Sequence, residues 1–351
     1  MLEVWEPDGA FARLESWLRD QGFFAPGGEH LLADVFLAYG LSSQLQRGAA
    51  RPPEPCRLPL IAARLRGDEP QPVPPGQLTV GAWQRSWTAE QYRRAVAEVR
   101  AAIARGDVYQ VNLVQHLQAQ FDGTVDELAR RLQTLSPLIG RAMQGEGWAV
   151  ASASPELFLE RRGAIVRTMP IKGTRAAGDA ASLMASPKDA AEHMMIVDLE
   201  RNDLSRVCEA GSVRWPSLME PRHLAGVEHL VSTVEGRLRA EAGLTELLEA
   251  TFPGGSITGA PKIAAVDLIA SLEPVGRGAS MGALGWIRGD GDLELALTIR
   301  TFAIADGELH FWVGGGIVWD SDPQDEVDES WTKARPVFDA IGAPLPGGVA
   351  A

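Results

Sequence analysis

Apolar residues recur at spacings of three and four in several segments of the chain, which is the pattern of one buried helix face. Residues 9–20 and 30–40 have this spacing and predict two short amphipathic helices. A longer helix is predicted to begin after Thr88, because Thr88 and Gln91 form a capping box, and to end at Gly106.

Two further helices are marked by a proline at the first helical position. Ser186 followed by proline predicts a helix over residues 187–206, and Asp322 followed by proline predicts a final helix that runs toward residue 341. Proline fits there because the N–H that it lacks has no intrahelical partner.

Strict alternation of apolar and polar residues marks the strands. In residues 108–117, Tyr109, Val111 and Leu113 fall on one face and polar residues fall on the other. Residues 147–171 read as three strands joined by tight turns, and an Asp-Gly pair predicts a hairpin within residues 296–316.

The strands come in runs with helices between the runs, which favours an α+β fold over a doubly wound α/β fold. Residues 51–76 are rich in proline and lack periodicity, so they are expected to form a linker or surface loop. We therefore expect an N-terminal region, 1–82, that packs on a core formed by residues 83–345.

Composition and charge exclude several classes of function. The net charge of −13 argues against a nucleic-acid partner, because binding to nucleic acid rests on cations that neutralise phosphates. Cys56 and Cys208 are too few for a disulfide framework or a four-cysteine zinc site. No apolar stretch approaches the roughly 20 residues that span a bilayer, and the N-terminus does not resemble a signal peptide. A soluble cytoplasmic protein is expected.

Acidic pairs three residues apart occur on two predicted helices. Asp189 and Glu192 share one helix face, and Glu326 and Glu329 share another. Mg²⁺ takes one or two protein carboxylates and keeps water or substrate oxygens at its other positions. On spacing alone, two solvated helix faces are the more common explanation.

Two glycine-rich segments, 253–262 and 313–321, are of the kind that exposes backbone N–H groups to carboxylates or phosphates. Tight turns explain them equally well. Arg300 lies among alternating apolar residues that predict a strand, where a buried guanidinium needs either a protein carboxylate or a bound anion.

Lys172, in TMPIKGTR (168–175), is a candidate nucleophile on a short strand that leads into a turn. At an ordinary pKa of about 10.4, only roughly one amine in 2,500 is neutral at pH 7, so this role needs a local environment that favours the neutral form. A solvated surface lysine is the alternative. Glu156 is either a general acid or an exposed carboxylate, and His229 taken alone is more often a core histidine.

The ordered motifs resemble the chorismate-utilising enzymes, the family of anthranilate synthase, aminodeoxychorismate synthase and isochorismate synthase. They are GDVYQVNL (106–113), SPELFL (154–159), PIKGTR (170–175), AEHMMIVDLERNDLSRVC (191–208), EHLVSTVEG (228–236), FPGGSITGAPK (252–262), ALTIRT (296–301), GGGIVWDS (314–321) and DESWTKA (328–334). So many long motifs in the family's order make the resemblance specific.

The resemblance implies an anthranilate synthase component I-like fold, a twisted two-layer antiparallel β-sandwich flanked by helices, with residues 83–345 as the catalytic domain. It implies that Glu192 and Glu329 hold Mg²⁺, with Asp189 and Glu326 as acidic support. The residues implied to bind chorismate are Arg300, the backbone amides of Gly314, Gly315 and Gly316, and the pocket residues Thr258, Gly259 and Lys333. His229 is implied to lie at the C4 side.

Two positions indicate a branch of the family. In the family that the chain resembles, members that add water at C2 carry a lysine base at the position of Gln110, so isochorismate and salicylate synthesis are not expected. Anthranilate-type members have alanine at the position of Lys172. The resemblance is therefore to aminodeoxychorismate synthase component I, in which this lysine attacks C2, ammonia then enters at C4, and Glu156 handles the protons.

The resemblance also implies a separate glutamine amidotransferase subunit, because neither cysteine lies in a nucleophile context. Three alternatives stay open: amination at C2, as in anthranilate or aminodeoxyisochorismate synthesis; a silent chorismate-binding subunit; and a pyridoxal-phosphate role for Lys172. The second is suggested by Ser280, where the family often has an aromatic residue. The region before Trp83 matches the family poorly, so tryptophan binding there is doubtful.

Overall fold

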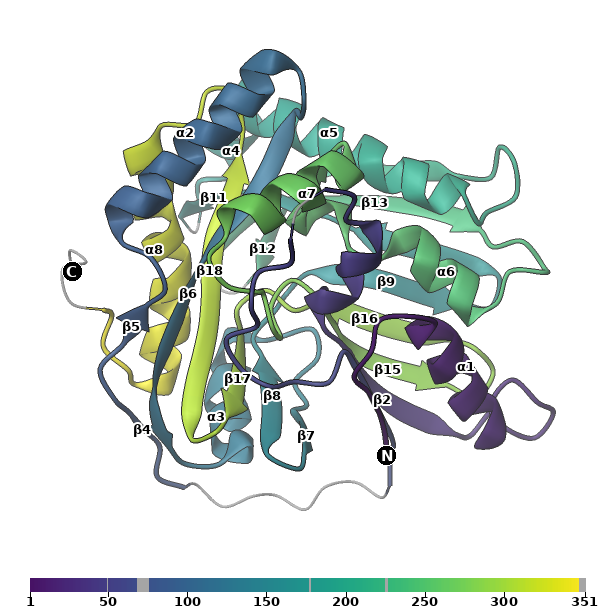
Figure 1. Cartoon of the computed structure of the whole chain (residues 1–351). Helices are drawn as coiled ribbons and strands as arrows, with labels where there is room; N and C mark the ends of the chain where they lie inside the picture. Colours follow the sequence, from purple (N-terminus) through teal and green to yellow (C-terminus); the bar gives the residue numbers. More distant parts are fainter. Residues whose placement is uncertain (49, 68–75, 177, 225–226, 347–351) are drawn as a thin grey trace.

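Two antiparallel sheets pack face to face and carry helices on their outer sides (Figure 1). The structure is a computed structural model that describes the whole chain except residues 49, 68–75, 177, 225–226 and 347–351. Side-chain contacts of residues 174, 176, 188 and 224 also lie outside the description. The α+β class and the two-layer arrangement expected from the sequence are confirmed.

The larger sheet has ten strands and carries the candidate nucleophile, Lys172, near one end. In spatial order it contains β1 (Leu2–Val4), β3 (Ile61–Leu65), β2 (Leu32–Leu37), β15 (Ala283–Arg288), β16 (Leu293–Leu297), β9 (Leu157–Arg162), β10 (Ile165–Met169), β13 (Val227–Arg237) and β11 (Ile171–Ala176), while β12 (Arg214–Leu224) also pairs with β13.

The smaller sheet has eight strands, and its long central pair positions the glycine-rich segment 314–316. It contains β14 (Gly259–Ala260), β6 (Gln110–Asp122), β18 (Glu308–Ile317), β17 (Thr301–Ala305), β8 (Trp148–Ser152) and β7 (Met143–Gly145), with β4 (Thr79–Val80) and β5 (Gln84–Arg85) pairing with β6. The Asp306-Gly307 hairpin joins β17 to β18, as expected.

The helices cover the two sheets and connect their runs of strands. They are α1 (Ala10–Asp20), α2 (Ala89–Arg105), α3 (Val125–Leu132), α4 (Ala180–Met184), α5 (Pro187–Ser205), α6 (Leu244–Thr251), α7 (Lys262–Leu272) and α8 (Pro323–Ile341), with 3₁₀ turns at Tyr39–Leu45, Gln133–Leu135 and Gly255–Ile257. The capping box of Thr88 and Gln91 is confirmed, as are the caps at Ser186 and Asp322. None of the helices in the described residues combines the length and the apolar character needed to cross a bilayer.

Two apolar cores hold these layers together. One lies between the sheets, where Phe36 of β2 approaches Trp148 of β8 with ring centroids 6.2 Å apart, and it continues under α1, α5 and α6. The other lies between the smaller sheet and α2, α3 and α8. β6 belongs to both, because Val111 and Leu113 face the helices and Val114 faces the larger sheet.

Three expectations about local structure are wrong. Residues 30–40 form β2 and a 3₁₀ turn. β2 lies between β3 and β15 and, apart from the buried Asp34, carries apolar residues on both faces, so it lacks the alternation of a half-buried strand. Tyr109 does not share the buried face of Val111: it precedes β6 and is 65% exposed.

The third concerns the Pro-rich segment 51–76: residues 51–60 form a loop as expected, but the segment also contains β3. Its residues 68–75 lie outside the described part of the chain. The strands β1, β2 and β3 of the N-terminal region join the larger sheet through the pairing of β2 with β15.

Candidate functional site

Lys172 lies on β11, opposite Leu230 of β13, and its side chain points toward two other elements. Its Nζ is 3.3 Å from Oε1 of Glu192 on α5 and donates a hydrogen bond of 3.3 Å to the carbonyl oxygen of Ser256. The side chain is only 12% exposed. The predicted nucleophile is therefore a largely buried amine at the junction of β11, α5 and the segment that begins at Pro253.

Glu156 lies just before β9 and faces the same junction. Its Oε1 accepts a hydrogen bond from Ser256 Oγ at 2.7 Å and one from the Ile171 backbone N–H at 3.3 Å. Burial raises the pKa of this carboxyl, and the Ser256 hydroxyl and the nearby Lys172 charge only partly oppose that rise. A buried carboxyl with a raised pKa is suited to donate a proton.

Ser256 is the residue that the sequence alone did not single out. Its hydroxyl binds Glu156 and its carbonyl oxygen binds Lys172, so it joins the candidate acid to the candidate nucleophile. The glycine-rich segment around it was a visible signal. Which of its polar groups faced the site depended on Glu156, 100 residues earlier in the chain.

Glu192 receives a second hydrogen bond, from Gln110 Nε2 at 3.0 Å. Gln110 is 1% exposed and occupies the start of β6. A Cβ added at Gly316 would overlap Gln110 Nε2 and lie 3.0 Å from Glu192 Oε1, so a larger residue there would displace these two side-chain groups. As a neutral amide donor, Gln110 cannot act as a base.

α8 brings a second lysine and two carboxylates to the glycine segment. Lys333 Nζ is 2.7 Å from Glu329 Oε1 and donates to the Gly314 carbonyl oxygen at 3.3 Å. Burial alone would lower the pKa of Lys333, but the carboxylates of Glu329, Glu326 and Glu192 outweigh burial and raise it. Lys333 is thus held as a cation.

Gly314, Gly315 and Gly316 pair with β6 on one side only. β17 pairs with β18 as far as Phe311, and no strand among the described residues covers the same side of β18 beyond that point. Alternate residues of an antiparallel strand direct their N–H groups to opposite sides. Part of this segment therefore has backbone donors available to a ligand.

Arg300 does not lie inside a strand, as the sequence predicted, but between β16 and β17 with a left-handed φ of 52°. Burial lowers the pKa of its guanidinium, and the carboxyl of Glu156 partly compensates. Within the described residues, no carboxylate or acceptor lies within hydrogen-bonding or ion-pair distance of the guanidinium. Of the two roles that the sequence left open, this environment favours binding of an anion.

Thr258 and Gly259 shape the segment opposite β6. The Thr258 hydroxyl donates to the Gly254 carbonyl oxygen at 2.9 Å, and its own carbonyl oxygen accepts from the Asn112 N–H at 2.8 Å. Gly259 has a φ of 142°, and a Cβ there would overlap the Gln110 carbonyl oxygen. A glycine is therefore needed for this segment to pair with β6.

His229 and Asp189 have defined partners near Lys172. His229 Nδ1 donates a hydrogen bond of 2.7 Å to the Gly173 carbonyl oxygen. In the neutral ring the proton is therefore on Nδ1, and Nε2 carries the lone pair. Burial lowers the pKa of His229, although the Gly173 carbonyl opposes this, so the ring is neutral at pH 7. Asp189 accepts a hydrogen bond of 2.7 Å from Arg175, which compensates its charge.

The acidic residues suit a hard divalent cation. Glu192 and Glu326 approach the glycine segment from α5 and α8, since Glu192 Oε1 would lie 3.0 Å from a Cβ at Gly316 and Glu326 Oε2 3.2 Å from one at Gly315. Among the described residues, no three side chains of His, Cys, Asp or Glu are grouped to chelate a metal. Mg²⁺ does not need such a group, because one or two carboxylates suffice when substrate oxygens and waters complete its shell.

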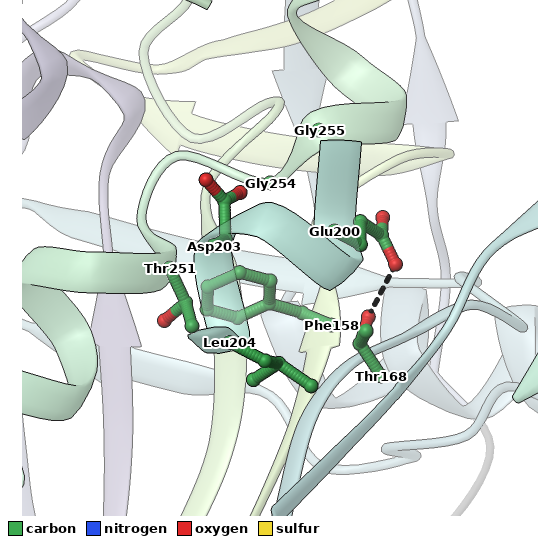
Figure 2. Close-up of a pocket in the computed structure, with 8 residues that line it drawn as sticks. All are labelled: Phe158, Thr168, Glu200, Asp203, Leu204, Thr251, Gly254 and Gly255. Carbon is green, nitrogen blue, oxygen red and sulfur yellow. Dashed lines mark hydrogen bonds between the residues drawn. The ribbon is translucent and has the colours of Figure 1, made fainter. Parts of the chain in front are cut away.

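A small cavity of about 10 Å³ lies behind the segment that carries Ser256 (Figure 2). Its walls include Phe158, Gly254 and Gly255, and Thr168 donates a hydrogen bond of 2.8 Å to Glu200 there. Burial, with a contribution from the nearby Glu156 charge, raises the pKa of Glu200 to about 8 despite the Thr168 hydrogen bond. The site thus has a second buried acid behind its first.

The chain is similar to proteins that are named as first components of two synthases. The anthranilate synthase component 1 of Streptomyces coelicolor is 39% identical over 311 residues, covering 85% of this chain and 59% of the relative. The aminodeoxychorismate synthase component 1 of Klebsiella aerogenes is 40% identical over 288 residues, covering 79% and 64%. The chain thus spans about three fifths of the length of these relatives.

The fold is shared with a solved structure of the same kind. The anthranilate synthase component I of Streptococcus pneumoniae superposes with a TM-score of 0.79 at 28% identity, covering 87% of this chain and 80% of that one. The model of the chorismate binding enzyme family matches residues 5–339. This match includes every residue of the site described above, and the chain belongs to the chorismate binding enzyme family.

Proposed function

We propose that this chain is the chorismate-aminating component of an aminodeoxychorismate synthase, converting chorismate and ammonia to 4-amino-4-deoxychorismate. The observation that carries the proposal is the connection of Lys172 to Glu156 through Ser256. It places an amine and a proton donor of raised pKa on one hydrogen-bonded segment.

The reaction divides into two displacements, each transmitted through the conjugated diene of the ring. In the first, Lys172 Nζ forms a bond to C2, both ring double bonds shift, and the C4–oxygen bond breaks as Glu156 protonates the departing hydroxyl to water. In the second, ammonia bonds to C4, both double bonds shift back, and the C2–Nζ bond breaks. Glu156 then takes the extra proton of the new amine. Covalent catalysis replaces one difficult displacement by two easier ones.

The substrate would be held mainly by its carboxylates. Arg300, Lys333 and the free backbone donors of residues 314–316 supply positive charge or N–H groups, and Thr258 and Gly259 shape the facing wall. Glu192 and Glu329, with Asp189 and Glu326 as acidic support, would hold Mg²⁺, which when bound supplies charge for the ring carboxylate. His229 would face the C4 side with its neutral ring.

Ammonia would come from a separate glutamine amidotransferase subunit. Burial raises the pKa of the Cys208 thiol to about 11 and that of the Cys56 thiol as well, so neither is a ready thiolate. Both relatives described above are named as component 1, which supports a partner component.

Amination at C2, which yields anthranilate, is the second candidate, because a relative named anthranilate synthase is as similar as those named for C4 amination. The purified chain, chorismate, Mg²⁺ and ammonium should give a product that a 4-amino-4-deoxychorismate lyase converts to 4-aminobenzoate. Fluorescent anthranilate formed without the lyase would overturn the C4 assignment.

A silent chorismate-binding subunit is a further alternative. Ser280 is fully buried and donates a hydrogen bond of 3.3 Å to the Thr298 carbonyl oxygen, in place of the aromatic residue frequent in the family. The same assay separates the two: chorismate binding by calorimetry without consumption of chorismate, with or without ammonium, would contradict the enzymatic proposal.

A further inference from the structure

Among the described residues, one edge of β6 has no strand partner where β6 supports the site's glycine segment. β18 covers one side of β6 along Val111–Gln120. On the other side, β14 pairs with Gln110 and Val111, and β5 pairs with Leu117 and Gln118. Between them no strand of the described part of the chain pairs with this side.

A buried ion pair fills that gap. Glu273 Oε1 accepts a hydrogen bond of 3.0 Å from the Val114 N–H, and Arg277 Nη2 donates one of 2.6 Å to the Asn112 carbonyl oxygen. These are the kinds of contact that a neighbouring strand makes with its backbone. The two side chains bind each other through two hydrogen bonds of 2.9 and 2.7 Å and are 1% and 2% exposed.

The same pair also reaches the facing wall of the site. Arg277 Nη1 donates to the Ile257 carbonyl oxygen at 2.8 Å, and the Asn112 side chain donates to that oxygen at 3.1 Å. Ile257 lies between Ser256 and Thr258, which face Glu156 and β6 respectively. One guanidinium therefore connects β6 to the loop that carries Ser256.

Through the pairing of β6 with β18, the position of β6 also sets the position of residues 314–316. Asn112 pairs with Gly316 and Val114 pairs with Gly314, so the two residues that the ion pair holds are the ones opposite the glycines. A displacement of this part of β6 would move the backbone donors of residues 314–316. It would also change their separation from Thr258.

Net stability does not explain such a pair, because a buried ion pair is often no more stabilising than apolar residues of similar volume. Directional hydrogen bonds explain it better. A planar guanidinium can serve Glu273, Ile257 and Asn112 at once, and its face lies 4.6 Å from the ring centroid of Tyr39. A lysine ammonium has neither the fork nor the stacking face.

We propose that Arg277 and Glu273 are positioning residues that replace a missing strand beside β6 and thereby set the spacing between residues 314–316 and the Ser256–Thr258 loop. The role requires the chorismate site but not a particular aminated product. This role predicts that a substitution in the Arg277–Glu273 pair weakens chorismate binding more than the same substitution in a similar ion pair outside the site.

The matched pair is Glu127 and Arg131 on α3. It has the same four-residue spacing, Glu127 is 1% exposed, and Arg131 donates to the Ile341 carbonyl oxygen at 2.7 Å. It is attached to the last residue of α8, away from Glu329 and Lys333. Arg131 gives Glu127 one hydrogen bond of 2.8 Å through Nε, and Arg130 gives it two more. Arg131→Lys therefore replaces an arginine that binds both a buried carboxylate and a backbone carbonyl oxygen, without touching the site.

The experiment compares Arg277→Lys with Arg131→Lys in the full chain. Both are expected to lower the Tm, but only Arg277→Lys is expected to raise the chorismate KM, by about tenfold or more, which corresponds to about 1.4 kcal/mol. Its kcat should fall by a smaller factor. An unchanged KM in Arg277→Lys, with a Tm loss equal to that of Arg131→Lys, would overturn the proposal.

Two further measurements test the proposal if Arg277→Lys does not fold or if the wild-type chain shows no turnover. If Arg277→Lys does not fold, Glu273→Gln is compared with Glu127→Gln in the same way, because the amide keeps an acceptor for the Val114 N–H but loses the charge and one of the two acceptors for Arg277. If the wild-type chain binds chorismate without turnover, the Kd replaces the KM, and the proposed function fails while this proposal is still tested. Failure of the wild-type chain to bind chorismate would overturn both.

Discussion

The two walls of the site hold lysines in different surroundings. The inner wall, Glu156, Lys172 and Ser256, is buried, with Glu156 4% and the Lys172 side chain 12% exposed. The outer wall on α8, Glu326, Glu329 and Lys333, reaches solvent at two of its residues: the side chains of Lys333 and Glu329 are 30% and 54% exposed, whereas Glu326 is 5% exposed. The inner wall is organised around hydrogen bonds, the outer wall around charge.

The different surroundings of the two lysines indicate two different roles, a binding cation for Lys333 and a nucleophile for Lys172. Lys333 forms a 2.7 Å ion pair, and the surrounding carboxylates raise its pKa, which suits a permanent cation that attracts an anionic ligand. Lys172 has longer contacts, 3.3 Å to Glu192 and 3.3 Å to a backbone carbonyl oxygen. An amine that must lose a proton and move to carbon is better served by such contacts.

Among the substitutions that test this difference between the two walls, Lys172→Ala should have the largest effect. We expect kcat for C4 amination with ammonium to fall on the order of 10³-fold or more, because removal of a covalent nucleophile leaves only binding and charge stabilisation. Chorismate binding by calorimetry should persist, since the outer wall is intact. C4 amination at near wild-type rate in this variant would refute the nucleophile assignment.

Glu156→Gln should have the next largest effect. The amide keeps an acceptor for Ser256 but cannot donate a proton to the departing hydroxyl, so kcat should fall about 10²-fold. In the wild type the acid form is the active one, and burial raises the pKa of Glu156. The rate should therefore fall as pH rises through this raised pKa, and the pH-rate profile of the variant should lack that limb.

Lys333→Met tests the outer wall alone. We expect the chorismate KM to rise about tenfold, the equivalent of about 1.4 kcal/mol, with kcat changed little, because a binding cation acts on ground state and transition state alike. Steady-state kinetics at two salt concentrations provides the measurement. A loss in kcat as large as that of Lys172→Ala would show that the two walls do not divide their tasks.

The smallest effect concerns Glu200, behind the inner wall. Its pKa is about 8 in the folded protein and 4.5 is the unperturbed value, so between these pH values the folded state binds more protons than the unfolded state. Stability from this group is present below about pH 4.5 and is lost as pH rises toward 8. Glu200→Gln should raise the Tm by roughly 2 °C or more at pH 8 and little at pH 5, as scanning calorimetry would show. A constant difference at both pH values would contradict the buried acid.

The sequence predicted the elements whose signals are local. The caps at Thr88, Ser186 and Asp322 each depend on a side chain that binds the next helical turn, and all three were confirmed. β2 was predicted as a helix because a strand buried on both faces has no alternation. Arg300 was predicted to lie in a strand, because an arginine gives no sequence signal for the left-handed conformation that it adopts between β16 and β17.

For the site, the motifs named most of the residues, but not their connections. Lys172, Glu156 and Glu192 were singled out, yet their link through Ser256 and Gln110 appears only when β6, β11 and α5 are brought together. Arg277 was not predicted from the sequence, because a buried arginine that binds backbone carbonyl oxygens has no characteristic periodicity or motif spacing.

The sequence by itself determined the family, the fold class and the chemical inventory, since these rest on motifs and on local periodicity. The tertiary structure decided which lysine is buried beside an acid and which is exposed beside carboxylates, because burial and charge environment come from residues distant in the chain. It also decided that a side-chain pair, Arg277 and Glu273, supports β6 where no strand of the described residues pairs with it. The reason is physical: every buried backbone group needs a partner, and only the assembled fold shows which group supplies it.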